Sequence, residues 1–320
     1  MLLFCLFCGL FIVSADRQGG CALVIFVHVP KTGGCTQYSI FEKWHGFVTR
    51  SFRLSDHDHA TPGRKNSALD AAVPREYTQL MHYLTTLEPQ DLKGGDHKFA
   101  VELHRCHGLR KALADITLAR STFEAQGCPA VVFTTLRQPV AAAQSWQGMK
   151  NHSAVAPGRE CADPRWLSSN GGIVANMQSK WLWFEGAEPK ADNAGICGVK
   201  NLNTRPTMNT VESAALAGLL DDLDFVGITE NFDLTNFGVG ELLGLSRAQL
   251  CLSIGTRRGN QIGPNVRKGL SCKGVLGEAL SRLLHDDLSA YKKYHNKFLK
   301  RFDGIDVEAL PKAIGESCFG

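Results

Sequence analysis

Residues 29–36 (Val-Pro-Lys-Thr-Gly-Gly-Cys-Thr) could bind an anion because of their types and their order. A lysine ammonium is a mobile positive charge, and threonine hydroxyls donate hydrogen bonds. Glycines let the main chain approach a ligand closely, and the N–H groups at a helix start attract negative charge. We therefore predict a phosphate-binding loop, with an ordinary strand-to-helix turn as the alternative. The candidate ligands are Lys31, Thr32, Gly33, Gly34, Cys35 and Thr36.

A second candidate anion site follows the apolar segment at residues 130–136 (Ala-Val-Val-Phe-Thr-Thr-Leu). Arg137 stands where this segment ends, and Ser145 comes two turns along a predicted helix. An arginine guanidinium binds phosphate through two parallel hydrogen bonds, and a serine hydroxyl can donate another. The pair predicts a second phosphate contact, and a surface arginine before a proline is the alternative.

The elements that must position these residues alternate between strands and helices. Apolar, β-branched runs predict strands at residues 22–29, 98–103, 130–136 and 224–228. Helical spacing of apolar residues predicts helices at 35–44, 74–87, 108–120, 139–150, 173–185, 210–220, 232–243 and 275–302. Residues 49–73 are polar and broken by Pro62-Gly63, so we expect a loop there. This order predicts an α/β fold with a central, mostly parallel sheet flanked by helices, and ligands at the carboxyl ends of its strands.

Length and charge restrict the class of protein. A chain of 320 residues can bury a large core, and 44% hydrophobic with 21% charged residues is typical of globular proteins. The net charge of +4 comes without a long basic run. That argues against nucleic acid as a partner and leaves room for local basic grooves that fit an acidic ligand.

The first fifteen residues carry no charge and have the character of a secretory leader. The apolar run from Leu2 to Val13 is short for a membrane span, and Val13-Ser14-Ala15 suits a signal-peptide cleavage site. A short membrane anchor is the alternative, because the usual basic residues before the apolar run are missing. We expect residues 1–15 to direct the chain into the secretory pathway and residues 21–320 to form a single domain.

Cysteine usage is consistent with that route. Nine of the eleven cysteines lie after the leader without a Cys-x-x-Cys pair, so we expect no zinc site. An odd number leaves one thiol unpaired, for which we choose Cys35. Candidate disulfides are Cys161–Cys197 and Cys251–Cys272, although spacing alone does not determine connectivity. Residues 151–153 (Asn-His-Ser) form an N-glycosylation sequon.

Together the two phosphate motifs resemble those of the sulfotransferases. Residues 29–36 resemble the 5′-phosphosulfate-binding loop of that family, and residues 136–146 resemble its 3′-phosphate-binding element. The Pro-Lys-Thr-Gly-Gly form looks most like the Golgi carbohydrate sulfotransferases, particularly the heparan sulfate 2-O/6-O and uronyl 2-O group. Three later segments match that group in order: Asn176 to Gln178, Phe225 to Glu230 and Asp286 to Phe298.

The resemblance implies a P-loop-like three-layer fold, 3′-phosphoadenosine 5′-phosphosulfate (PAPS) as donor, and no metal. The acceptor would be a hydroxyl of a carbohydrate such as an anionic polysaccharide, met in the Golgi lumen, at its membrane or after secretion. Lys31 would stabilise charge on the leaving phosphate oxygen, and the N–H groups of residues 32–36 would hold the phosphosulfate. Arg137 and Ser145 would bind the 3′-phosphate. Arg267 and Lys268 resemble a loop that contacts this phosphate in cytosolic sulfotransferases.

The same resemblance places a catalytic base near the end of the second predicted strand. We choose His104 there, because it closes the strand and an imidazole titrates near neutral pH. His107 and Glu102 are the alternatives.

Two positions depart from the family pattern and keep other functions open. Gln138 replaces the acid that usually follows the arginine, and Cys35 stands where serine or threonine is more usual. A catalytically inactive relative that binds a nucleotide or a glycan is therefore one alternative. A P-loop-like kinase is another, although a Walker A loop has its lysine after the last glycine, whereas Lys31 precedes the glycines here.

Overall fold

A computed structural model describes a large part of the chain. The described residues are 20–29, 32–44, 46–52, 61–62, 73–93, 97–103, 108–150, 176–183, 208–246, 249–250, 278 and 281–303.

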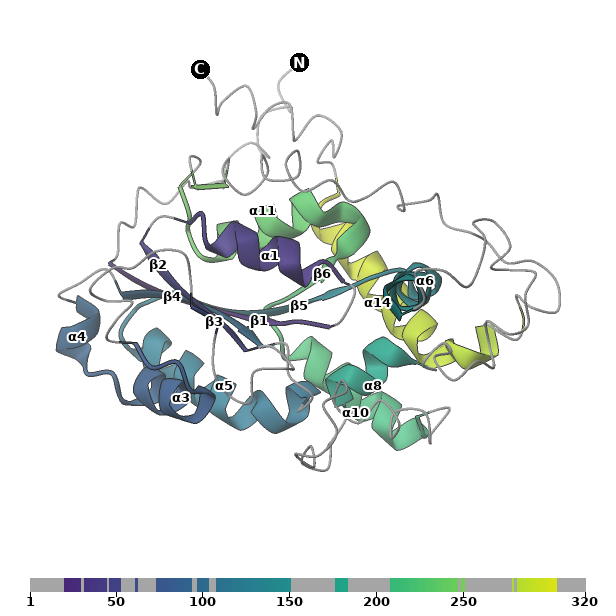
Figure 1. Cartoon of the computed structure of the whole chain (residues 1–320), viewed down its shortest axis with the longest axis horizontal. Helices are drawn as coiled ribbons and strands as arrows, with labels where there is room; N and C mark the ends of the chain where they lie inside the picture. The colour runs from purple at the N-terminus through teal and green to yellow at the C-terminus, as the bar shows by residue number, and fades with distance from the viewer. Residues whose placement is uncertain are drawn as a thin grey trace, which may run out of the picture.

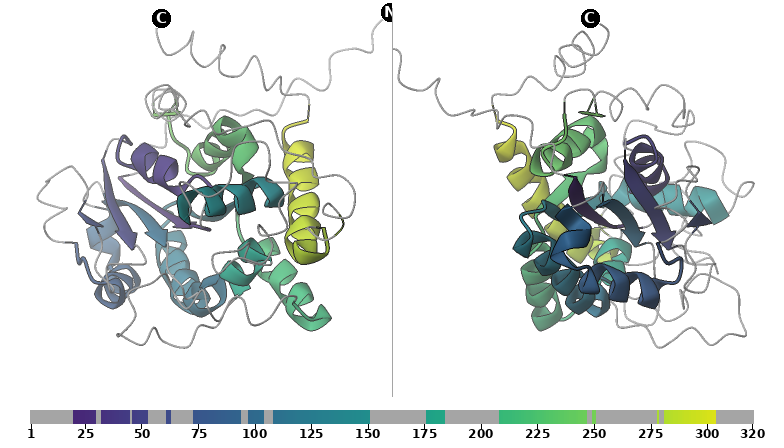
Figure 2. Two further views of the ribbon diagram at one scale, coloured as in Figure 1. Left: turned by 45° about the vertical axis from the view of Figure 1, so that its right-hand side comes forward. Right: turned by 90° about the vertical axis from the view of Figure 1, so that its left-hand side faces the viewer.

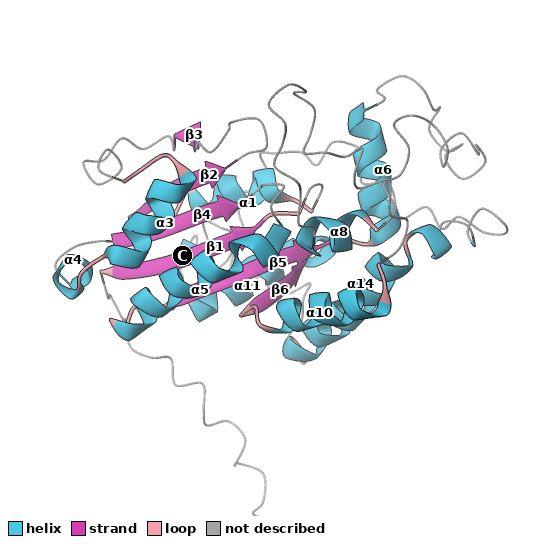
Figure 3. Ribbon diagram, turned by 90° about the horizontal axis from the view of Figure 1, so that it is seen from below, coloured by secondary structure: helices cyan, strands magenta, loops and turns pink. Residues whose placement is uncertain are grey.

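The centre of the molecule is a six-stranded sheet with the strand order β3-β2-β4-β1-β5-β6 (Figure 3). Its strands are β1 (Cys21–Val27), β2 (Phe47–Phe52), β3 (Thr61–Pro62), β4 (His97–Leu103), β5 (Ala130–Leu136) and β6 (Phe225–Ile228). All neighbouring strands are parallel except β2 and β3, so the expected mostly parallel sheet is confirmed. β1 is central, with β4 on one side and β5 on the other.

Helices cover both faces of the sheet (Figure 1). One face carries α1 (Gly34–Phe41) and α11 (Phe232–Leu242), and the other carries α3 (Tyr77–Thr86) and α5 (Gly108–Ala125). The chain therefore leaves β1 toward one face and the adjacent β4 toward the other. Such a divergence forms a crevice at the carboxyl ends of parallel strands, which is where α/β proteins bind ligands.

The remaining helices gather beside β5 and β6, and α14 contacts β6, α6 and α8 (Figure 2). They are α6 (Pro139–Lys150), α8 (Met177–Trp183), α10 (Thr210–Asp221) and α14 (His285–Arg301), while the short α4 (Pro89–Lys93) follows α3. None of the helices within the described ranges is long and apolar enough to cross a membrane.

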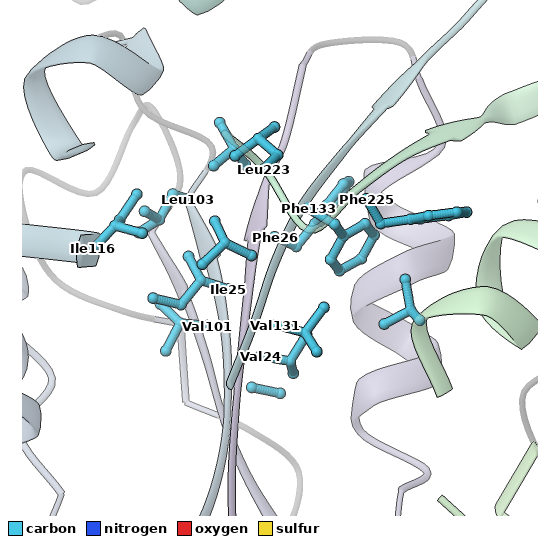
Figure 4. Packing of buried hydrophobic residues seen from close by; sticks show 14 of the residues in the cluster. Val24, Ile25, Phe26, Val101, Leu103, Ile116, Val131, Phe133, Leu223 and Phe225 are labelled. Carbon is cyan, nitrogen blue, oxygen red and sulfur yellow. The ribbon is translucent and has the colours of Figure 1, made fainter. Parts of the chain in front are cut away.

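Alternating side chains of β1 build the core on both faces of the sheet (Figure 4). Phe26 packs against Phe133 of β5, with ring centroids 4.8 Å apart, and against Phe41 of α1. Ile25 lies on the opposite face from Phe26, beside Val101 of β4. This two-sided burial explains why β1 reads as one continuous apolar run.

Strand β2 lies partly in residues 49–73 and β3 lies wholly in them, so the expectation of a loop there is wrong for residues 49–52 and 61–62. Arg50 explains why the sequence pattern did not predict β2, since a charged residue rarely lies at a buried strand position. Its guanidinium is buried and donates hydrogen bonds to the carbonyl oxygens of Val73 (2.9 Å) and Pro74 (3.2 Å). The charge therefore ties β2 to the segment that leads into α3.

One helix begins later than its pattern predicts. The helix expected from residue 74 begins at Tyr77, because Glu76 before it has an extended backbone.

The helix expected over 275–302 is confirmed where the structure describes it. Residue 278 and residues 281–283 are helical, and after a turn at Leu284 the chain continues as α14 from His285. The expected apolar residues Tyr294 and Phe298 are buried.

A disulfide joins Cys21, at the start of β1, to Cys128, just before β5. It was not among the candidate pairs, and those pairs (Cys161–Cys197 and Cys251–Cys272) lie outside the described residues. The bond closes a chain segment with a sequence separation of 107. It thereby fixes the amino ends of two paired strands whose carboxyl ends carry the two predicted phosphate motifs.

We predict that replacing Cys21 and Cys128 by serine lowers the free energy of unfolding by about 3–5 kcal/mol, as expected for a loop of about 100 residues. Denaturant unfolding of both proteins, with and without reductant, measures this. Reductant should destabilise the wild type more than the variant. Equal sensitivity of the two proteins to reductant would contradict the prediction.

Candidate functional site

Hydrogen bonds from threonine hydroxyls hold the turn after β1 in place. Thr32 is fully buried, and its hydroxyl donates to the carbonyl oxygen of Val29 at 2.7 Å. Thr135, near the end of β5, has its hydroxyl 2.9 Å from the Thr32 hydroxyl, and Thr229 donates to the Thr32 carbonyl oxygen at 2.9 Å. The expected role of the Thr32 hydroxyl as a donor to an anion is therefore corrected, since this hydroxyl donates to the main chain of the turn itself.

Gly33 links this turn to the start of α1. Its φ of 92° and ψ of 14° are left-handed, which a residue with a side chain adopts only at a cost. The N–H of Gln37 donates to the carbonyl oxygen of Gly33 at 3.0 Å and closes the first helical turn. The N–H groups of residues 34–36 thus lie in the first turn, where a helix has no internal acceptors for them. Gly33, the N-cap residue, has no side chain with which to cap this helix start.

Arg137 is held in place by the side chain of Gln178 on α8. The Gln178 amide accepts a hydrogen bond from the N–H of Arg137 and donates one to its carbonyl oxygen, each at 2.8 Å. The Arg137 side chain is half-buried, and this burial lowers the pKa of its guanidinium while Glu230 opposes the shift. Glu230 lies just after β6, in the short 3₁₀ turn at residues 229–231.

The side chain of Gln138 caps the start of α6. Its side-chain oxygen accepts from the N–H of Ala141 at 2.7 Å, while its own N–H donates to Glu230 at 3.0 Å. An acid at this position would accept the same hydrogen bond from the helix start. Gln138 therefore supports the start of α6 as an acid at this position would. Ser145 is partly exposed on the same helix, two turns after Arg137.

A buried carboxylate supports α8 in turn. Asp287 of α14 accepts hydrogen bonds from the N–H of Gln178 at 3.1 Å and of Ser179 at 2.7 Å. Burial raises the pKa of Asp287, whereas these hydrogen bonds act to lower it. Burial also lowers the pKa of Lys180 to about 8, although Asp287 favours its charged form. Asp287 thus satisfies two N–H groups of the helix start where the dipole favours a negative charge.

Glu102, an alternative for the base, is enclosed near the carboxyl end of β4. It is 2% exposed and accepts a hydrogen bond from Ser51 at 2.5 Å. Its other oxygen lies 2.8 Å from Nδ1 of His28, an ion-pair distance without the alignment of a hydrogen bond. Both carboxylate oxygens face protein groups, so Glu102 is poorly placed to take a proton from a bound molecule.

Several predicted site residues lie outside the described ranges, namely Lys31, His104, His107, Arg267 and Lys268. The backbone of Gly34, Cys35 and Thr36 is described as the start of α1. The structure therefore brings together the turn at Thr32–Gly33 and the Arg137 segment, through Thr135. Among the described residues, no three histidine, cysteine, aspartate or glutamate side chains are grouped so that they could hold a metal ion.

The three later segments that match the family contain Gln178, Thr229 and Asp287, but the sequence motifs assign none of these residues a role in holding the site together. Thr135 and Thr229 look like ordinary strand-end threonines, and Asp287 lies on the expected amphipathic helix. A polar pair, Thr134-Thr135, inside an otherwise apolar strand was the available signal. Both hydroxyls bond to main-chain oxygens of the β1 segment, Thr134 to that of Val27 at 2.6 Å and Thr135 to that of Thr32 at 3.1 Å.

Comparison with known proteins adds a distant likeness. No protein-family model matches the sequence, and no curated protein matches it with significance. The structure aligns distantly with the crystal structure of a sulfotransferase from Alicyclobacillus acidocaldarius, with 14% identity and a TM-score of 0.33. That alignment covers 85% of this chain and 98% of the other. Such a TM-score does not establish a common fold, so any functional assignment depends on the residues of the site.

We predict that Gly33→Ala destabilises the protein more than Gly127→Ala. Both glycines have positive φ (92° and 73°), so alanine strains either backbone by about 1–2 kcal/mol. A Cβ at Gly33 would also lie 3.1 Å from the ring of Phe232, whereas nothing lies within 4 Å at Gly127. Urea unfolding of the two variants measures the difference. Equal losses would show that the turn at Gly33 tolerates a side chain.

Proposed function

We propose that this protein is a PAPS-dependent sulfotransferase that transfers a sulfuryl group to a hydroxyl of a carbohydrate acceptor. The observation that carries the proposal is the direct link between the two motifs. Thr135 hydrogen-bonds to Thr32 at 2.9 Å, two residues before Arg137. The turn at Thr32–Gly33 and Arg137 are thereby held at the same edge of the sheet, as a ligand with phosphates at both its 5′ and 3′ positions requires.

The chain offers suitable groups for each part of the donor. The open first turn of α1, with left-handed Gly33 before it, fits the 5′-phosphosulfate because unpaired N–H groups and the dipole attract an anion. Arg137, held through its main chain by Gln178, fits the 3′-phosphate, and Ser145 lies on the helix that follows. Lys31, Arg267 and Lys268 complete the proposed set of cationic ligands. No metal is needed in this scheme, since these donors neutralise the phosphates.

The proposed reaction breaks the bond between sulfur and the phosphate oxygen and forms one between sulfur and the acceptor oxygen. The acceptor proton passes to a base, and 3′-phosphoadenosine 5′-phosphate (PAP) leaves. As in phosphoryl transfer, the protein contributes positioning and charge stabilisation, here through Lys31 and the N–H groups of the turn. We assign the base to His104, which follows directly after β4. The enclosed carboxylate of Glu102 supports this choice over Glu102 itself.

We further propose that the protein acts in the secretory pathway, in the Golgi lumen, at its membrane through the N-terminal segment, or after secretion. The Cys21–Cys128 bond supports an oxidising compartment, because disulfides rarely persist in the cytosol. Golgi-type glycan sulfation, on an acceptor such as an anionic polysaccharide, fits that compartment. An inactive relative that binds nucleotide or glycan is the second candidate, because Cys35 departs from the family pattern.

We predict that PAP binds saturably to the wild type and that Lys31→Ala and Arg137→Ala each weaken binding about 10- to 150-fold. That range corresponds to the loss of one charged hydrogen bond, about 1.5–3 kcal/mol. Isothermal titration calorimetry measures the affinities. Lys43→Ala and Arg75→Ala are matched charge controls at exposed positions, and both should bind PAP as the wild type does. Absence of PAP binding by folded wild type would rule out the proposed function.

We predict that His104→Gln reduces sulfate transfer by about 10²–10⁴-fold while PAP affinity stays unchanged, as expected for loss of a general base. The assay follows transfer of radiolabelled sulfate from PAPS to a panel of polysaccharides and oligosaccharides. Glu102→Gln and His107→Gln are the comparison variants. A larger loss in either one would move the base to that residue. PAP binding without transfer by the wild type, over the whole panel, would instead identify an inactive relative.

A further inference from the structure

Arg137 leaves β5 at a point where the sheet no longer pairs its main chain. The last paired residues of β5 and β6 are Leu136 and Ile228, and β6 ends there. Beyond this pair, the N–H and C=O of Arg137 meet the amide of Gln178, each at 2.8 Å. The glutamine side chain therefore satisfies both main-chain groups, as a neighbouring strand would.

We propose that Gln178 is a positioning residue that gives the site its selectivity for a 3′-phosphate, by fixing the main chain from which the Arg137 guanidinium extends. This inference rests on the proposed function. An arginine side chain has several rotatable bonds, so its head group is directed only if the Cα–Cβ bond is directed first. Two hydrogen bonds at one residue fix the peptide planes on both sides of that Cα.

Gln178 is itself held rigidly enough for this task. Its side chain is 2% exposed, and its own N–H donates to Asp287 of α14. The next residue, Ser179, donates to the same carboxylate at 2.7 Å. A continuous set of buried hydrogen bonds thus leads from α14 through the start of α8 to Arg137. A side chain needed only for filling space would not require an amide that matches both main-chain groups.

Two variants separate positioning from packing. Gln178→Met keeps the length of the side chain and removes both hydrogen bonds to Arg137. Gln178→Glu keeps an acceptor for the N–H of Arg137, but at neutral pH it sets a carboxylate oxygen against the Arg137 carbonyl oxygen. When that carboxylate is protonated, its O–H can donate to the carbonyl again, so acid should restore the missing hydrogen bond.

The test is the ratio of affinities for PAP and 5′-AMP, two nucleotides that differ in the 3′-phosphate. We expect Gln178→Met to lower the PAP affinity roughly tenfold and to leave the 5′-AMP affinity within about twofold, so that the ratio falls. Leu182→Ala, at a buried apolar position on the same helix, should destabilise the protein and keep the ratio. For Gln178→Glu, the ratio of PAP affinity to 5′-AMP affinity should be low at pH 7.5 and should recover toward the wild-type ratio at pH 5. The wild type is measured at both pH values for comparison.

The Arg137→Ala background shows whether the effect passes through the guanidinium. Arg137→Ala should lose the preference for PAP, and adding Gln178→Met should lower it no further. If wild type prefers PAP and Gln178→Met keeps that preference, or if both ligands weaken equally, Gln178 has only a structural role and this inference is wrong. If wild type does not prefer PAP over 5′-AMP, the proposed 3′-phosphate site is itself wrong and this inference falls with it.

Discussion

The site depends on the hydrogen bonds by which Thr135 and Thr229 hold Thr32. A glycine turn at the end of a strand has many conformations available, and the entropy of choosing one opposes binding. Here hydroxyls from the ends of two later strands reach the residue before the first glycine and fix the plane of its carbonyl. The direction in which α1 begins follows from that plane, as does the direction of its unpaired N–H groups.

Two buried charged side chains of this fold, Arg50 and Asp287, are satisfied mainly by main-chain groups. Arg50 donates to carbonyl oxygens that lead into α3, and Asp287 accepts from N–H groups that open α8. A buried ion is costly unless its hydrogen-bonding capacity is used, so each of these side chains specifies one position of the segment it contacts. Gln178 does the same without a charge. Segments without a strand partner are thus fixed by single polar side chains.

The sequence predicted the sheet well where strands are uniformly apolar, as in β1 and β5, since burial on both faces leaves one strong pattern. It failed at β2, because Arg50 breaks that pattern and the hydrogen bonds that make it tolerable come from residues 73 and 74. The two phosphate motifs could be found because they are local in sequence. The contacts between them could not, since Thr229, Glu230, Gln178 and Asp287 lie 40 or more residues from the segments they touch.

The central place of β1 has a consequence for how the chain is made. Both neighbours of β1 are synthesised after it, and β5 is complete only at Leu136. At roughly 5–20 residues per second, β4 is complete about 4–15 s and β5 about 5–22 s after β1, so both edges of this apolar strand stay open until β4 has been made, and one edge until β5 has been made. During that time Cys21 also meets Cys35 and Cys106 before its partner Cys128 exists. An apolar strand with open edges can pair with other chains, so the time before β4 and β5 are complete is when β1 is most prone to aggregation.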